Sequence, residues 1–219
     1  MKKSNFQRIL PFNTFLILTL AAAANASFAQ QNKPTAQPTN PLTEQKAASQ
    51  PQTAATPDPF ASIPAANPAD VSSLDAIVKA VYNVISGDAG TKRDWNRFRS
   101  LFYPGARLIP TGMNPTTKQG GGRVFTPEEY IERSSPLMAK EGFYESEIAR
   151  RTETFSTITH VFSTYESKHK LADEKGFQRG VNSIQLLNDG KRWWILTIAW
   201  SGETPETPLP EKYLKAVEK

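Results

Sequence analysis

Few residues of this chain could carry out acid–base chemistry, and they come from different parts of the sequence. His160 lies in a strand-like run, and its imidazole would act as a general base if that side of the strand faces inward. Tyr82, in a helix-like segment, and Asn182, in a later strand-like segment, would donate hydrogen bonds to a bound molecule. The predicted catalytic residues are therefore His160 and Tyr82, and the reaction would be of the lyase or isomerase type.

Each of these residues also has a purely structural interpretation. On a solvated or subunit-contact face, His160 would have no catalytic role, and Tyr82 could simply lie at the edge of the core. Arg107 would pair with an acidic ligand or, structurally, with Glu153 or Asp94. The apolar face of the last two predicted strands carries no clear Asp or Glu, and this absence argues against proton transfer.

The residue patterns for metal binding, phosphate binding and catalysis by a serine nucleophile are absent from the sequence. The only histidines, His160 and His169, would lie on opposite faces of a strand, and the chain has no cysteine, so no metal site is expected. The glycines at 120–122 are not followed by the Lys-Ser/Thr pair and helix of a phosphate-binding loop. No Gly-x-Ser-x-Gly motif marks a serine nucleophile. We expect neither a metal nor another cofactor.

The charge of the chain gives no indication of nucleic-acid binding. The 219 residues carry a formal charge of +5, from 26 Lys and Arg against 21 Asp and Glu. Lys2, Lys3 and Arg8 belong to the N-terminal segment, and without them 23 basic residues face 21 acidic ones. The two signs also alternate along the chain rather than clustering, so we expect no nucleic-acid partner.

The N-terminal third of the sequence is predicted to contain a signal peptide followed by a linker. Residues 1–29 combine a basic start, an apolar run and the small-residue ending of a signal peptide, with cleavage before Gln30 or near Ser27. An uncleaved membrane anchor is the alternative, but the run is short for a membrane span. Residues 30–70 are rich in Pro, Gln, Ala and Thr, which predicts a disordered linker. We expect a periplasmic or secreted protein with no stable membrane span after cleavage.

Apolar periodicity predicts one folded domain at 71–204 and a C-terminal tail at 205–219. Residues at helical spacing predict helices over 72–86, 95–103 and 126–141, with a short strand at 106–109 and a loop at 110–124. From residue 143 the period changes to two, predicting strands over 143–155, 158–168, 177–187 and 192–200. This order predicts an α+β fold, with N-terminal helices packed on a strongly curved antiparallel sheet.

The last two predicted strands form the hairpin around which the domain is organised. A three-residue loop of Asn, Asp and Gly at 188–190 joins them and would pair Ile184 with Trp194. A two-residue Asp-Gly turn is the alternative, and it would place Gln185 opposite Trp194, mixing polar and apolar side chains on each face. We prefer the three-residue loop because it separates the two kinds of side chain.

That register assigns each face of the hairpin a role. The mostly apolar face would lie under the helices and line a pocket for a small apolar molecule. With aromatic residues of the helices, the predicted pocket residues are Trp95, Phe98, Phe102, Asn182, Trp194, Leu196 and Trp200. The opposite face would expose Val181, Trp193 and Ile195, an apolar patch of the kind that marks an interface. We expect a homodimer through this outer face, unless 143–155 or the tail from Pro205 covers it.

Two motifs resemble the nuclear transport factor 2-like superfamily, in particular its SnoaL-like, polyketide-cyclase-like branch. They are Phe-Tyr-Pro-Gly-Ala-Arg-Leu at 102–108 and Arg-Gly-Val-Asn-Ser at 179–183, and the similarity extends over 71–203. The resemblance implies a cystatin-like cone, a pocket between sheet and helices, and dimers through the open sheet face. Members of the superfamily include enzymes that use a pocket carboxylate and non-catalytic binding proteins. Since a fold does not select among these functions, we expect an exported domain that binds a small apolar molecule, with an enzyme or a dimeric interaction module as alternatives.

Overall fold

The structure is a computed structural model and describes residues 58–215. The helices are α1 (Pro68–Val71), α2 (Leu74–Ile85), α3 (Trp95–Ser100) and α4 (Pro127–Glu141), and a short 3-10 helix η1 (Glu211–Tyr213) lies near the end. The strands are β1 (Phe102–Met113), β2 (Gly120–Gly122), β3 (Tyr144–Phe155), β4 (Ile158–Lys168), β5 (Gln178–Asn188) and β6 (Trp193–Gly202).

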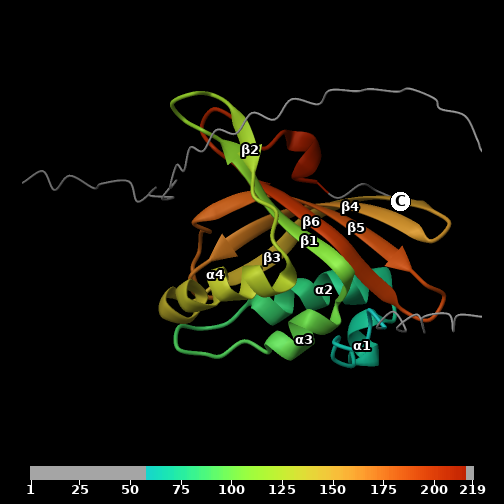
Figure 1. Ribbon diagram of the computed structural model, residues 1–219. Helices are drawn as coiled ribbons and strands as arrows, with labels where there is room; N and C mark the ends of the chain where they lie inside the picture. The colour runs from blue at the N-terminus through green and yellow to red at the C-terminus, as the bar shows by residue number, and fades with distance from the viewer. Residues whose placement is uncertain (1–57, 216–219) are drawn as a thin grey trace, which may run out of the picture. The chain divides into compact units, whose positions relative to one another are not determined.

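The α-helices pack against one face of a single sheet, whose strand order is β2-β1-β6-β5-β4-β3 (Figure 1). Strands β3 to β6 form the antiparallel meander expected from the sequence. Strand β1 instead runs parallel to β6, so the sheet is mixed rather than antiparallel throughout. Only a hairpin forces neighbouring strands to be antiparallel, and no hairpin joins these two. The predicted α+β arrangement, with helices packed on a sheet, is confirmed.

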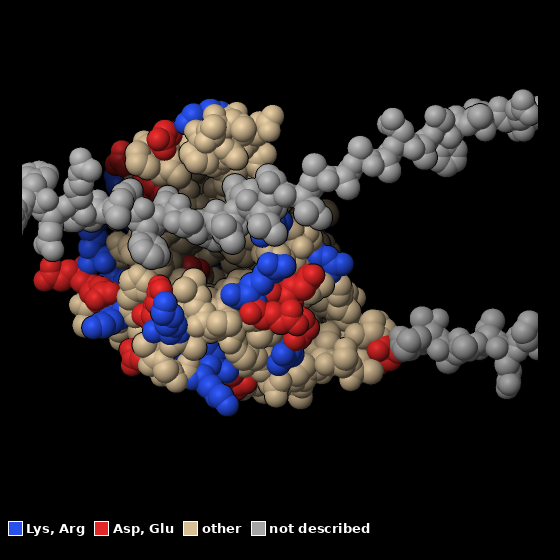
Figure 2. Space-filling view, turned by 60° about the vertical axis from the view of Figure 1, so that its left-hand side comes forward, with Lys and Arg blue, Asp and Glu red and all other residues tan. Residues whose placement is uncertain are grey.

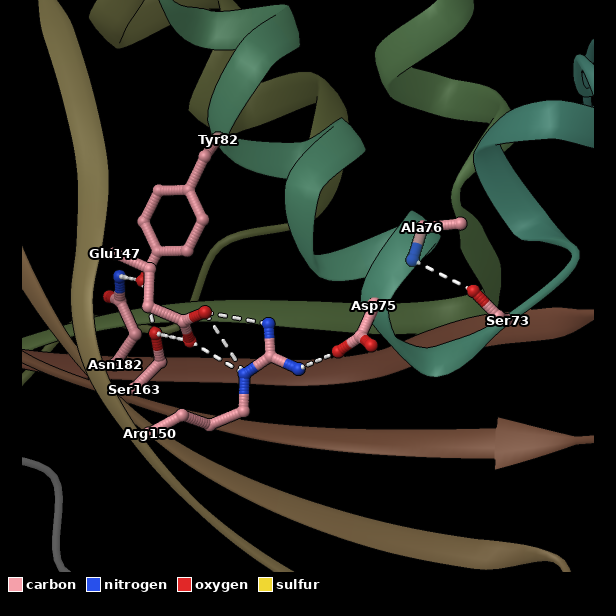
Figure 3. A network of polar contacts seen from close by, with 8 residues as sticks. All are labelled: Ser73, Asp75, Ala76, Tyr82, Glu147, Arg150, Ser163 and Asn182. Carbon is pink, nitrogen blue, oxygen red and sulfur yellow. Dashed lines mark hydrogen bonds and ion pairs between the residues drawn. The ribbon is translucent and has the colours of Figure 1, made fainter. Parts of the chain in front are cut away.

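The core lies between α2 and the sheet. Ser73 caps α2 by accepting a hydrogen bond from the Ala76 amide (Figure 3), and the apolar side of the helix faces the strands. The fully buried apolar residues of this layer include Ile77 and Val78 from α2, and Val161, Ile184, Leu186 and Ile195 from the sheet. The start of α4 is as predicted, with Pro127 first and a capping box between Thr126 and Glu129.

The second helix is shorter than expected, and the strand after it is longer. Helix α3 ends at Ser100, and Phe102 already begins β1, where it pairs with Ile195 of β6. Gly105, with a φ of +81°, lies within an irregularity of this pairing. The segment at 110–124, predicted to be a loop, contains the end of β1 and all of β2. Backbone pairing with β6, which helical periodicity does not report, determines where α3 ends.

The predicted register of the last hairpin is wrong. Asn188 pairs with Trp193 and Ile184 with Ile198, whereas Ile184 was expected opposite Trp194. An irregularity opposite Gln185 and Leu186 leaves one extra residue, Leu196, in β6. Because a bulge of one residue reverses the alternation of side chains beyond it, β6 does not keep a single apolar face.

The bulge changes which residues face the helices. Ile195 is 0% exposed and Trp193 packs against the core, so neither belongs to an exposed outer patch. Trp194 lies on the opposite side, where its ring contacts Phe60 and Tyr103 and its indole nitrogen donates to Asp189 at 2.7 Å. Through these contacts the ring and the indole nitrogen of Trp194 both find partners outside the predicted pocket.

Both ends of the described chain pack on the domain. Phe60, within the segment assigned to the linker, contacts Tyr103 with its ring at 5.3 Å, and α1 follows it, so ordered structure begins before residue 71. In the tail, the Tyr213 ring packs on Phe162 at 5.0 Å, and Thr164 donates to the Tyr213 carbonyl at 2.5 Å. The tail thus covers part of the outer sheet face, as in the intramolecular alternative to a dimer.

Acidic and basic side chains are interspersed on the face of the molecule seen in Figure 2. This distribution matches the alternation of charges in the sequence. Among residues 58–215, no helix is long and apolar enough to cross a membrane.

Candidate active site

A carboxylate, Glu145, lies between the helices and the sheet. It stands near the start of β3, opposite Ser167 of β4, and its backbone amide donates to Ser86 at 3.0 Å. One carboxylate oxygen accepts from the Asn182 side-chain amide at 3.2 Å, and the other accepts from the Ser167 hydroxyl at 2.9 Å. Within the described residues, Glu145 forms no ion pair.

Burial therefore dominates the proton affinity of this group. Removal from water disfavours the charged form and raises the pKa of Glu145 to about 7, while the two hydrogen bonds from Ser167 and Asn182 oppose the rise. Neutral donors stabilise a carboxylate less than a cation does. Glu145 can thus gain and lose a proton near neutral pH.

Three tyrosine side chains lie close enough to Glu145 to be affected by its charge. They come from different elements: Tyr82 from α2, Tyr130 from α4 and Tyr165 from β4. The pKa of each phenol is raised, first by burial and second by the negative charge of Glu145. Gly180 gives Tyr165 its space, since a Cβ there would lie 2.5 Å from the phenol oxygen. Glu145 therefore lies near three weak acids.

A second carboxylate, Glu147, lies on the same face and is neutralised by a cation. Arg150 donates to it through Nε at 2.9 Å and through Nη2 at 2.6 Å (Figure 3). A bulge at Ile148 makes this pairing possible, because the extra residue returns Arg150 to the face that Glu147 occupies. Arg150 also reaches Asp75 at the start of α2, at 2.5 Å.

Tyr82, Ser163 and Asn182 connect the two carboxylates. The Tyr82 oxygen lies 2.6 Å from the Ser163 oxygen and accepts from the Asn182 amide at 3.0 Å. Ser163 donates to Glu147 at 2.5 Å, and Asn182 also donates to Glu145. Figure 3 shows Tyr82 reaching from α2 toward these sheet residues. The structure thus brings together two predicted site residues, Tyr82 and Asn182.

His160 is not part of this group. The helix-facing side of β4 carries Ser163, Tyr165 and Ser167, so the alternate residues, His160 among them, lie on the outer side. There the His160 Nε2 lies 2.9 Å from the hydroxyl of Ser183. The sheet therefore separates His160 from Tyr82, and the predicted catalytic pair does not form.

Four of the predicted pocket residues lie in one aromatic cluster. It consists of Trp95, Phe98, Phe102 and Trp200, together with Tyr130, and its ring centroids are 4.7–6.1 Å apart. Phe98 and Phe102 are fully buried, whereas Trp95, Tyr130 and Trp200 are half-buried. Trp200 is the cross-strand neighbour of Asn182, so the aromatic cluster adjoins the polar network.

The other predicted positions lie elsewhere. Trp194 is on the outer side and Leu196 is at the bulge of β6. Of the predicted interface residues, Val181 alone is on the outer face, half-buried and opposite Ser201, while Trp193 and Ile195 contribute to the core. The apolar patch that motivated the dimer is therefore absent from the described surface, and the homodimer stays a prediction.

Two surface grooves lie away from the polar network. One, of about 660 Å³, is formed by the β4–β5 turn around Lys175 and by the tail around Pro205. The other, of about 380 Å³, lies beneath the segment at Pro59 and includes the predicted pocket residue Phe102. Within 58–215, no three His, Asp or Glu side chains are grouped to hold a metal ion.

Sequence reasoning missed the two carboxylates. It sought an inward acid on the last hairpin, whereas Glu145 and Glu147 are on β3. Their spacing of two residues, which places alternate side chains of a strand on one face, is the one signal that could have placed them together. The strands of the last hairpin carry no Asp or Glu, as expected, but this absence does not argue against proton transfer, because β3 supplies the inward carboxylates.

Comparisons with known proteins identify similar folds. No protein-family model matches the chain, and no curated protein matches it. A solved structure of a cystatin-like protein of unknown function from Nostoc punctiforme is 11% identical with a TM-score of 0.46, and the similarity covers 63% of this chain and 92% of that one.

Two further solved structures have related descriptions. A nuclear transport factor 2-like protein of unknown function from Silicibacter pomeroyi is 14% identical with a TM-score of 0.41, over 60% of this chain and 94% of that one. A candidate ketosteroid isomerase from Parabacteroides distasonis is 11% identical with a TM-score of 0.40, over 60% and 89%.

Proposed function

We propose that this protein binds a small, largely apolar molecule between the helices and the sheet, and that Glu145 exchanges a proton with it, in a reaction of the isomerase or lyase type. One observation carries the proposal: Glu145 is half-buried beside Tyr82, Tyr130 and Tyr165, accepts hydrogen bonds only from neutral groups, and has a pKa raised to about 7. A general base is most effective when its pKa lies near the working pH.

The loss of folding stability caused by a carboxylate without a cationic partner supports a functional role for Glu145. A buried carboxylate without a cation destabilises the fold once it ionises, and such groups occur preferentially at functional sites. Glu147, two residues further along β3, has a guanidinium partner, so the lack of one at Glu145 is specific to that position. In this proposal Asn182 and Ser167 hold the carboxylate in place, and Glu145 acts as the base.

The aromatic cluster would provide the apolar wall for the bound molecule. Its half-buried members Trp95, Tyr130 and Trp200 come from two helices and β6. Tyr130 lies near Glu145, and Trp200 is the cross-strand neighbour of Asn182. Flat, apolar side chains of this kind bind ring systems by contact with their faces. The proposed substrate class is therefore a small ring compound with one acidic hydrogen.

Non-catalytic binding is the second candidate, and one observation favours it. The Tyr82 hydroxyl lies 2.6 Å from Ser163 and its oxygen accepts from Asn182, so this phenol is already engaged within the protein. A proton-transfer enzyme gains from a donor aimed at the developing oxyanion. A binding protein has no such requirement.

The enzyme proposal predicts proton-linked binding of 2-naphthol, a small ring compound with one acidic hydroxyl whose emission differs between its neutral and ionised forms. We expect binding with a Kd of about 10⁻⁴ M, with emission from the ionised form increasing as Glu145 accepts the proton. Glu145→Gln should remove the increase in emission from the ionised form on binding, and Trp200→Ala should weaken binding about tenfold or more. Fluorescence titration at pH 7 measures both effects.

Gln185→Ala is the matched control, because Gln185 is exposed on β5 and lies away from the network. It should behave like the parent protein. Binding that Glu145→Gln leaves unchanged, in affinity and in emission, would favour the non-catalytic candidate. Absence of binding in the parent protein would count against both candidates.

We also propose that the protein is exported. The basic start, apolar run and small-residue ending of residues 1–29 support this, and those residues lie outside the described part of the chain. N-terminal sequencing of the native protein should begin at Gln30 or near Ser27. Recovery of protein that starts at Met1 from the cytoplasm would contradict export.

A further inference from the structure

The chain of hydrogen bonds that leads away from Glu145 ends at a fixed ion pair. Arg150 holds Glu147 through three contacts of 2.6–3.0 Å and holds Asp75 through another nitrogen, joining β3 to the first turn of α2 (Figure 3). A guanidinium has only donors, and an ionised carboxylate only accepts. Glu147 can therefore receive a hydrogen from the interior but has none to give.

This end point determines the direction of every hydrogen bond before it. Ser163 donates its single hydrogen to Glu147 at 2.5 Å. In the contact between Ser163 and Tyr82 at 2.6 Å, Tyr82 must then be the donor. The Tyr82 oxygen is left as an acceptor, and it accepts from the Asn182 amide at 3.0 Å.

Asn182 is the branch point between the two carboxylates. One of its amide hydrogens goes to Tyr82 and the other goes to Glu145, at 3.2 Å. If the chain ran in the opposite direction, the Tyr82 hydrogen would no longer be donated to Ser163 and would be free to point toward the site. The direction of the chain therefore decides whether Tyr82 acts there as an acceptor or as a donor.

We propose that Glu147 is a positioning residue for this site: through Ser163 it orients the Tyr82 hydroxyl away from Glu145 and keeps the Asn182 amide directed at the Glu145 carboxylate. This inference deepens the proposed function and rests on Glu145 being the reacting group. Glu147 does not touch the bound molecule. It acts by keeping the Tyr82 hydrogen from competing with that molecule for Glu145.

The test follows the ionisation of Glu145 in the full chain by the ¹³C shift of its carboxyl carbon, with Glu145→Gln used to assign the signal. Glu147→Gln presents an amide to Ser163 and so reverses the direction of the hydrogen bonds. Ser163→Ala interrupts this series of hydrogen bonds without changing any charge. Both variants release the Tyr82 hydrogen, and a donor near a carboxylate favours its charged form. We expect each to lower the midpoint of Glu145 ionisation by about half a pH unit or more.

The double variant separates positioning from a merely structural role. If Glu147 acts through Ser163, the combined change should be no larger than the larger single change, because both substitutions break one chain. Asp75→Asn is the control. It removes the outer partner of Arg150 but leaves the hydrogen bonds from Glu147 to Glu145 intact, so the midpoint of Glu145 ionisation should not move. Urea unfolding of each variant establishes that it folds.

Additive shifts, an unchanged midpoint in Ser163→Ala, or a shifted midpoint in Asp75→Asn would each overturn the inference. This outcome is independent of the proposed function, because it depends on differences between variants. The proposed function depends on the midpoint of the parent protein, and a value near the ordinary 4.5 of a glutamate would remove it.

Discussion

Replacing Ile195 by Glu is expected to prevent stable folding. The Ile195 side chain is 0% exposed and contributes to the core between α2 and the sheet. The substitution removes a large apolar group, which alone costs about 2–5 kcal/mol in comparable cores, and places an unpaired carboxylate in its position. Because domains of this size are stable by only about 5–15 kcal/mol, circular dichroism should show an unfolded or aggregating protein.

Val181→Glu is the matched control, since the sequence assigned both residues to the outer face. Val181 is half-buried on that face, so its replacement should cost about 1 kcal/mol or less. Urea unfolding monitored by tryptophan fluorescence compares the two variants. A folded Ile195→Glu would contradict the bulge in β6, because without the bulge Ile195 would face outward.

Replacing Glu145 by Gln is expected to stabilise the protein at alkaline pH. In the folded state the pKa of Glu145 is about 7, above the ordinary value of 4.5. Between these values the folded protein keeps a proton that the unfolded chain releases, so stability falls as pH rises from about 4.5 through about 7. Above pH 7 the whole penalty is present, up to about 3 kcal/mol. Gln has nearly the same shape without the charge.

The measurement is urea unfolding of the parent and Glu145→Gln proteins at pH 8 and pH 4. The variant should be more stable at pH 8 by about 1–3 kcal/mol, and the difference should nearly vanish at pH 4, where the parent carboxyl is protonated. Glu132→Gln is the control, because Glu132 is exposed on α4, and it should show neither change. A variant destabilised equally at both pH values would mean that the carboxyl contributes only its hydrogen bonds.

The elements of this fold follow largely from local sequence. The apolar spacing in 74–85 predicts α2, and the Thr-Pro-Glu-Glu run at 126–129 places the start of α4, because both depend on contacts within a few residues. The alternating pattern from residue 143 likewise predicts β3 to β6 within one or two residues. The α+β order of these elements was therefore predictable.

The two bulges were not predictable from the alternation. Each adds one residue to a strand, at Ile148 in β3 and at Leu196 in β6, and each reverses the side-chain alternation beyond it. Neither residue type marks a bulge by itself. With the bulge in β6, Trp194 packs on Phe60 and Tyr103 on one side of the sheet, and Ile195 enters the core on the other. The partners of Trp194 come from segments distant in sequence.

The sequence by itself determined the longer elements, α2 to α4 and β3 to β6, their order, and most of the aromatic residues that gather between helices and sheet. Tertiary structure alone decided which face His160 and Glu145 occupy, and therefore which of them belongs to the site. The physical reason is that a strand residue has two possible sides, and pairing with other strands selects between them. The proton affinity of Glu145 depends in turn on burial beneath α2 and α4, which no local pattern encodes.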